Sequence, residues 1–177
     1  MSKVQMRFAG TGGQGMMLIG DLMAYALGMK EDKEIVLLKS YGPEARGGAC
    51  RSELIADDNK INYPAITCPT FLLTMSQMSY DSYTEDADEN TVILVDSELV
   101  KNTDSKYKNT YCVPLTRIAI DKCGKNICAN IVALGAICKI TKLTSKEKMI
   151  EVLKEKLNPK ILDLNLKAFK EGWEAVD

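Results

Sequence analysis

A glycine-rich turn between an apolar strand and an apolar helix constrains this chain most. The stretch VQMRFAGTGGQGMMLIGDLMAYALG, residues 4–28, predicts a strand over 4–9 and a helix over 16–27, with Gly28 as the helix stop. Four glycines separate the two elements, and glycine adopts backbone conformations closed to other residues. The unit is typical of an α/β domain whose turn lies at the carboxyl end of a strand.

The glycines of this turn have the spacing G-x-G-x-x-G. Gly10 permits a tight turn, Gly12 lets the backbone approach a ligand, and Gly15 lets the helix pack close to the strand. Gly13 adds further freedom, and the Gln14 side chain offers hydrogen bonds. Since the start of a helix presents unpaired N–H groups and a positive dipole, we expect these five residues to bind an anionic group.

The full dinucleotide-binding pattern is not met. It requires an acidic residue at the end of the second strand, about twenty residues after the glycines, where this chain has Lys39 and Ser40. A P-loop is excluded as well, because no Gly-Lys-Ser/Thr follows. A tight turn without any ligand remains an alternative.

A second loop follows the next apolar strand, which we predict over 34–39 as a buried parallel strand. Its sequence, SYGPEARGG, holds an arginine between glycines, which suits a phosphate or carboxylate. An arginine paired with a neighbouring acid in a simple turn is the alternative. Both loops lie at carboxyl strand ends if the sheet is parallel. The candidate residues are Tyr41, Gly42, Pro43, Glu44, Arg46, Gly47 and Gly48.

The rest of the chain continues the alternation of strands and helices. Residues 49–67 alternate apolar and polar around the turn sequence DDNK, which predicts a local antiparallel β-hairpin. Further strands are expected at 71–75, 91–95 and 111–113. Helices are expected from 77, over 127–140 as a buried helix, after a cap at Thr144 or Ser145, and from Pro159 to about 175. We predict one α/β domain over 1–177, with a mainly parallel sheet and a helical C-terminus.

Composition narrows the chemistry that this chain performs alone. The net charge is −1, which argues against nucleic-acid binding. No apolar run reaches the roughly 20 residues that span a bilayer, and we expect no signal peptide. There is no histidine, and the six cysteines form no C-x-x-C. We therefore expect free thiols, no metal site, a cytoplasmic location and no certain catalytic residue in this chain.

Three segments together resemble one family. FAGTGGQG at 8–15, SYGPEARGGACRSE at 40–53 and NIVALGA at 130–136 are similar to the gamma subunits of 2-oxoacid:ferredoxin oxidoreductases, above all the 2-oxoglutarate type. The resemblance covers nearly the whole chain and implies a Rossmann-like fold. It matches both loops and adds Asn130 to the candidate site residues. Thr11 departs from the pattern, because an aromatic residue often stands before Gly-Gly-Gln-Gly.

The resemblance implies a place in a larger enzyme. This family oxidatively decarboxylates a 2-oxoacid, transfers the acyl group to coenzyme A and passes electrons to ferredoxin. Thiamine pyrophosphate and 4Fe–4S clusters are held by partner subunits. The implied partners are alpha and beta subunits, a ferredoxin-like delta subunit or domain, and ferredoxin as acceptor. The gamma chain then completes the active site or the coenzyme A region, and the isolated chain is inactive.

Three questions stay open at this level. A stand-alone nucleotide-binding protein or NAD(P)-dependent reductase is the rival, which the missing acid disfavours, and a purely structural subunit is another. Pyruvate, branched-chain and aromatic enzymes share the pattern, so the 2-oxoacid and the stoichiometry are not determined. The glycine loop contacts either coenzyme A or a partner subunit, and the isolated chain has an exposed partner surface that would permit a homodimer.

Overall fold

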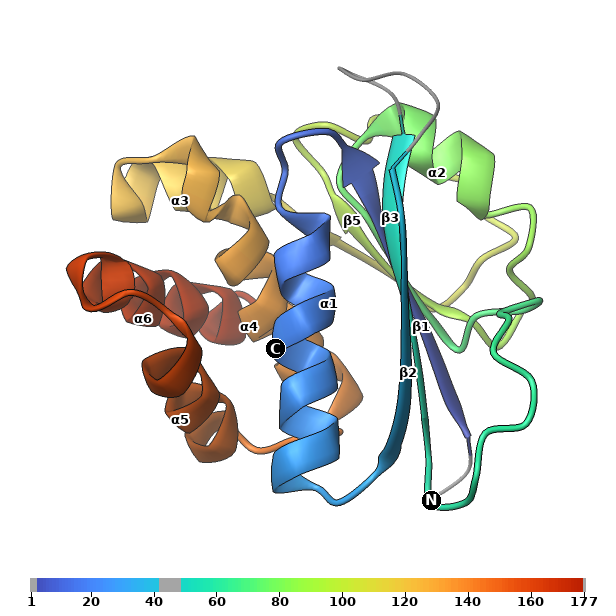
Figure 1. The fold of residues 1–177 in the computed structure, drawn as a ribbon. Coiled ribbons are helices and arrows are strands. Elements are labelled where there is room, and N and C mark those ends of the chain that lie inside the picture. Colours follow the sequence, from blue (N-terminus) through green and yellow to red (C-terminus); the bar gives the residue numbers. More distant parts are fainter. Residues whose placement is uncertain (1–2, 42–48, 177) are drawn as a thin grey trace.

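The computed structural model describes residues 3–41 and 49–176, which form a six-stranded sheet with helices on both faces (Figure 1). The strands are β1 (Val4–Thr11), β2 (Glu34–Ser40), β3 (Ala49–Asp57), β4 (Phe71–Thr74), β5 (Val92–Asp96) and β6 (Thr110–Val113). The helices are α1 (Met16–Tyr25), α2 (Gln77–Tyr83), α3 (Leu115–Cys123), α4 (Ala129–Thr141), α5 (Lys146–Lys156) and α6 (Pro159–Glu174). A π-helical turn, Ala26–Lys30, extends α1, and a 3₁₀ turn, Asn126–Cys128, precedes α4.

The sheet has the order β2-β3-β1-β4-β5-β6. Strands β1, β4, β5 and β6 are parallel, whereas β3 is antiparallel to both of its neighbours. In the register of β3, Arg51 lies opposite Ser40 on one side and Ala9 on the other. The carboxyl ends of β1 and β2 therefore lie at the same end of the sheet, which we call its carboxyl edge, as expected for the two candidate loops.

The predicted hairpin over 49–67 is only half correct. Strand β3 forms where alternation predicted it, but its antiparallel partners are β1 and β2. No strand follows the DDNK turn before β4 in the described chain. Both edges of β3 are already hydrogen-bonded, and Pro64 and Pro69 lack the N–H that a further strand would use. The local hairpin of this fold is thus β2–β3.

Strand β2 also differs from its prediction as a buried parallel strand. It is the edge strand of the sheet, and β3 is its antiparallel neighbour. The apolar residues of this strand point to both faces of the sheet. Ile35 and Leu37 pack against the main core, whereas Leu38 lies on the other face and is 43% exposed. A continuous apolar run does not distinguish a central strand from an edge strand whose two faces are partly covered.

Gly28 does not stop the first helix. The chain continues as a π-helical turn to Lys30, and the left-handed conformation falls on Asp32, with φ of 54°. A Cβ at Gly28 would lie 3.1 Å from Cγ1 of Ile35. The glycine therefore allows the turn to pack closely on β2.

Helices α1 and α3–α6 cover one face of the sheet, and α2 covers part of the other (Figure 1). Helix α4 is buried on all sides over Ala129–Cys138, as predicted from its apolar sequence. Ser145 caps the start of α5, because its side chain accepts a hydrogen bond from the Lys148 N–H, and Pro159 opens α6 as expected. The larger core lies between the sheet and these helices.

All six cysteines lie in the described residues and are free thiols. Cys138 is fully buried in α4, and this burial raises the pKa of its thiol far above the ordinary value. Burial likewise raises the pKa of Cys50 and Cys128. These three cysteines thus behave as small apolar residues of the core.

Candidate functional site

The glycine turn joins β1 to α1 at the carboxyl edge of the sheet. Gly10 is still part of β1, and Gly13 and Gly15 have φ of 91° and 77°, in the left-handed region. A Cβ at Gly13 would meet no atom within 4 Å, whereas one at Gly15 would lie 2.2 Å from Nδ2 of Asn130. Gly13 therefore faces open space, and Gly15 allows α1 to approach α4.

Gln14 holds this turn in place. Its Oε1 accepts a hydrogen bond of 2.7 Å from the Thr11 N–H, and its Nε2 donates one of 2.8 Å to the Met75 carbonyl. A Cβ at Gly10 would lie 2.5 Å from the same Oε1. The side chain that we expected to reach a ligand is therefore occupied within the chain, where it fastens the turn to the end of β4.

The start of α1 is open to an anion. Gly15 is its N-cap and has no side chain to cap the helix, and the first turn contains no acidic residue. The backbone N–H groups of a first helical turn have no partner within the helix. Together with the dipole of a ten-residue helix, they favour a negatively charged group at this position.

Asn130 supplies a further donor beside this helix start. Its side chain is only 7% exposed, and its Oδ1 accepts a hydrogen bond of 2.9 Å from the Ile131 N–H. Within the described chain, no hydrogen-bond partner is found for its Nδ2. This amide nitrogen adjoins the position of Gly15, and Asn130 lines the hollow described next, so that an N–H donor remains available to a ligand.

Two hollows flank the glycine turn. One, of about 330 Å³, lies between the turn and the start of α4 and α6. It is lined by Gly13, Gly15, Leu18, Lys125, Ile127, Cys128, Asn130, Ile161, Leu164 and Asn165. The other, of about 280 Å³, lies toward β4 and α3, with Gly13, Gln14, Met75, Leu99, Thr116, Asn126, Ile127 and Ala129 around it. Gly13 and Ile127 belong to both, so the hollows adjoin.

Lys125 and Ile127 give this region its chemistry. Lys125 is exposed at the rim of the first hollow, and no acidic partner for it is found in the described residues. Burial raises the pKa of the Cys128 thiol, and the positive charge of Lys125 offsets part of this rise. Ile127 is 76% exposed between the two hollows. The region thus offers a cation, an amide donor and an apolar surface around one helix start.

Of the predicted site residues, the structure brings Asn130 together with Gly13 and Gly15. Tyr41, 73% exposed, follows the carboxyl end of β2 at the same edge of the sheet. Gly42, Pro43, Glu44, Arg46, Gly47 and Gly48 lie outside the described residues. The sequence reasoning missed Lys125 and Ile127, for which the only signal was their place directly before a buried helix.

Lys39 and Ser40 occupy the place where a dinucleotide-binding site has an acidic residue. Lys39, near the end of β2, forms an ion pair of 2.7 Å with Asp21 of α1. A ribose would meet a lysine already bound to a carboxylate. The described residues contain no group of three or more cysteines and acids placed to hold a metal ion. None of their helices is both long and apolar enough to cross a membrane.

Comparison with known proteins is consistent with this geometry. A family model described as pyruvate ferredoxin/flavodoxin oxidoreductase matches residues 5–175. The chain belongs to this family. Among curated relatives, the 2-oxoglutarate synthase subunit KorC of Methanocaldococcus jannaschii is 40% identical over 96% of this chain and 92% of the relative.

Solved structures of this oxidoreductase family share the fold. A keto/oxoacid ferredoxin oxidoreductase gamma subunit from Geobacter sulfurreducens has a TM-score of 0.87 at 36% identity, over 99% of this chain and 97% of that chain. A 2-oxoglutarate:ferredoxin oxidoreductase from Magnetococcus marinus, solved with 2-oxoglutarate, coenzyme A and succinyl-CoA, has a TM-score of 0.87 at 23% identity. The match spans 98% of this chain but 31% of that one, so this domain also occurs within a longer chain.

Gly15→Ala is expected to destabilise the chain by about 2–3 kcal/mol, because a left-handed alanine and displacement of Asn130 both cost free energy. Gly13→Ala is the matched control, since its φ is also positive but no neighbour lies within 4 Å. It should cost about 1 kcal/mol. Urea unfolding of both variants checks this, and equal losses would show that contact with Asn130 does not constrain the turn.

Proposed function

We propose that this chain is the gamma subunit of a 2-oxoacid:ferredoxin oxidoreductase that acts on 2-oxoglutarate. The assembled enzyme releases carbon dioxide from the 2-oxoacid, joins the remaining acyl group to coenzyme A and passes two electrons to ferredoxin. Membership of the family and the identity to KorC support this role. The structural observation that carries it is the open start of α1 beside the buried Asn130 amide and Lys125.

The glycine turn binds an anionic group of coenzyme A in this proposal. The N–H groups at the start of α1 and the Nδ2 of Asn130 donate hydrogen bonds to a phosphate, and Lys125 adds a charge. Ile127 lies next to this group and offers apolar surface to the arm that leads to the thiol. A phosphate at a helix start with a flanking lysine is held through charge and hydrogen bonds together.

Thiamine pyrophosphate and the 4Fe–4S clusters belong to the partner subunits in this proposal. They supply the carbanion chemistry and the electron path. The partners we propose are alpha, beta and ferredoxin-like delta subunits in the cytoplasm. Tyr41 and the loop that carries Arg46 would meet them at the carboxyl edge of the sheet.

Lys125→Ala should raise the KM for coenzyme A about tenfold in the assembled enzyme, because loss of one charge-assisted contact is worth about 1.4 kcal/mol. The KM for 2-oxoglutarate should change less than twofold. Lys122→Ala, an exposed lysine of α3 that lines neither hollow, is the matched control. Steady-state kinetics with ferredoxin as acceptor measures both constants. An unchanged KM for coenzyme A in Lys125→Ala would remove this binding role.

A further inference from the structure

Strand β2 leaves one edge of the sheet unpaired. On its inner side all seven residues pair with β3, from Glu34 opposite Asp57 to Ser40 opposite Arg51. On its outer side no strand of the described chain follows, since β2 ends the strand order. Its outward N–H and C=O groups are therefore free to pair with another chain.

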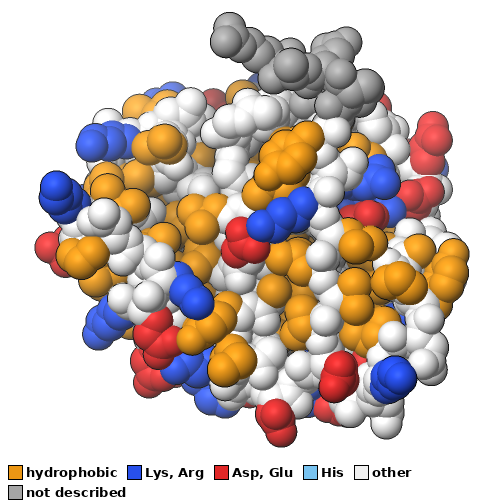
Figure 2. Space-filling view, in the orientation of Figure 1, with side chains coloured by type: hydrophobic (Ala, Val, Ile, Leu, Met, Phe, Trp, Pro, Cys, Tyr) orange, Lys and Arg blue, Asp and Glu red, His pale blue; other side chains and the backbone are white. Residues whose placement is uncertain are grey.

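This edge is unusually apolar. Ile35, Val36, Leu37 and Leu38 form an unbroken apolar run in which the first three side chains are half-buried and Leu38 is 43% exposed. Figure 2 shows hydrophobic side chains on both sides of the β2 edge, which faces the viewer in this orientation. The opposite edge, β6, has only four residues. Proteins usually protect exposed edges by shortness or charge, and β2 has neither over its central residues.

We propose that β2 of a second copy of this chain covers the edge. The two strands run antiparallel about a twofold axis perpendicular to the sheet, which joins two sheets into one. Pairing over all seven residues places Leu37 opposite Leu37, Val36 opposite Leu38 and Glu34 opposite Ser40. In this register the side chains of opposed residues lie on the same face of the sheet. The free N–H and C=O groups of one β2 strand also face those of the other, so that they can form hydrogen bonds.

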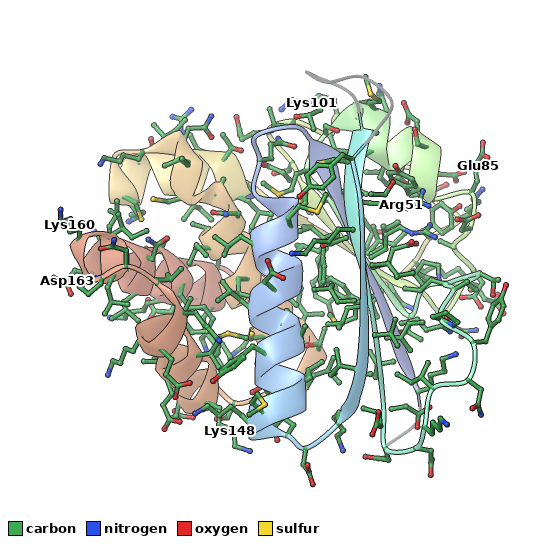
Figure 3. The ribbon with its side chains drawn as sticks, viewed as in Figure 1. Arg51, Glu85, Lys101, Lys148, Lys160 and Asp163 are labelled. Carbon is green, nitrogen blue, oxygen red and sulfur yellow. The ribbon has the colours of Figure 1, made fainter. Side chains whose placement is uncertain are left out.

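Charge complementarity favours a second copy in this orientation. The amino end of β2 is acidic, because Glu34 lies opposite Asp57 of β3. Its carboxyl end neighbours Arg51, which lies opposite Ser40 and points to the α2 side of the sheet (Figure 3). Antiparallel self-pairing therefore brings Glu34 of each copy across Ser40 toward Arg51 of the other, twice by symmetry.

Arg51 is held in position for this contact. Its guanidinium lies 5.2 Å from the centre of the Tyr83 ring, and its Nε is 3.3 Å from Oε2 of Glu53. The side chain nevertheless remains 35% exposed. It can thus interact with an acid of the second copy without leaving its present partners. The hollows beside the glycine turn involve no residue of β2, so the dimer can be tested separately from coenzyme A binding.

Sedimentation velocity of the isolated chain over a range of concentrations tests the dimer. We expect a reversible dimer whose dissociation constant rises at least tenfold in Leu38→Lys, because the two lysines would lie diagonally across the axis. Tyr111→Lys, on the other edge strand, is the matched control and should leave the constant within twofold. Circular dichroism verifies that both variants are folded. A wild-type chain that stays monomeric, or equal weakening by both variants, would overturn the proposal.

Amide hydrogen exchange then tests which strand makes the contact. In the dimer, alternate amides over 34–40 should exchange at least tenfold more slowly at high than at low protein concentration. The amides of β6 should not respond to concentration. A dimer in which β2 shows no concentration-dependent protection would contradict strand pairing and would place the contact elsewhere.

Discussion

Replacing Gly172 with alanine is expected to lower the free energy of unfolding by about 4 kcal/mol, at the severe end of overpacking effects. An added Cβ would lie 1.8 Å from the carbonyl oxygen of Val132 and 2.6 Å from its carbonyl carbon. These atoms belong to the backbone of α4, so no rotamer change relieves the overlap. Helix α6 would have to move away from the core.

Gly135, the glycine of α4 at the same crossing, shows why moving α4 and α6 apart would cost free energy. A Cβ at Gly135 would lie 2.1 Å from the Phe169 carbonyl oxygen and 2.7 Å from the Trp173 nitrogen. The two glycines thus permit backbone contact where α4 and α6 cross. Since α4 is buried on all sides, a shift of either helix opens voids in the main core.

Gly124→Ala is the control for this prediction. Gly124 has φ of 71°, yet its Cβ would meet no atom within 4 Å, so only the left-handed conformation is penalised, by about 1 kcal/mol. Urea unfolding followed by circular dichroism compares the variants. If Gly172→Ala were no more destabilising than Gly124→Ala, the close helix crossing would not exist.

Arg7→Met is expected to destabilise the chain by about 3 kcal/mol, because it removes the buried cation between Glu53 and Asp86 and leaves the largely buried Glu53 carboxylate only its longer contact with Arg51. Arg7 is 2% exposed, and its Nε and Nη1 lie 2.8 Å from Oε1 of Glu53 and 2.7 Å from Oδ2 of Asp86. Its guanidinium also lies 5.4 Å from the centre of the Tyr83 ring. The side chain of Glu53 is only 12% exposed, so water replaces little of the lost interaction.

Two further variants separate charge from packing at this cluster. Lys39→Met breaks the more exposed pair with Asp21 and should cost less than about 1 kcal/mol. Glu53→Gln added to Arg7→Met should recover part of the loss, because the buried charge is removed. Denaturant unfolding measures all three. A loss for Arg7→Met as small as that for Lys39→Met would contradict an essential buried ion pair.

Much of the fold was predictable because local patterns dominate it. The glycine turn, the buried helix α4, the cap at Ser145 and the start at Pro159 follow from local backbone chemistry and side-chain spacing. The place of β2 was not predictable in this way. Its apolar run suits both a central strand and an edge strand, and only the antiparallel insertion of β3 decides between them.

The candidate site was predictable in its backbone and not in its side chains. The spacing of Gly13 and Gly15 indicates an open helix start, which the structure has. Asn130 came from the family resemblance, because nothing local shows that a residue so distant in the sequence contacts Gly15. Lys125 and Ile127 reach the site only through tertiary packing of the turn before α4. For Gln14 the sequence suggested contact with a ligand, whereas in the structure its side chain is used in hydrogen bonds to Thr11 and Met75 that hold the turn itself.

Omission of this chain from the reconstituted enzyme tests the central proposal most directly. The alpha, beta and delta subunits would be assembled with and without it under anoxic conditions, and ferredoxin reduction would be followed with 2-oxoglutarate and coenzyme A. We predict reduction only when this chain is present, with 2-oxoglutarate used in preference to pyruvate. Equal reduction without the chain would contradict its role as the subunit that completes the enzyme.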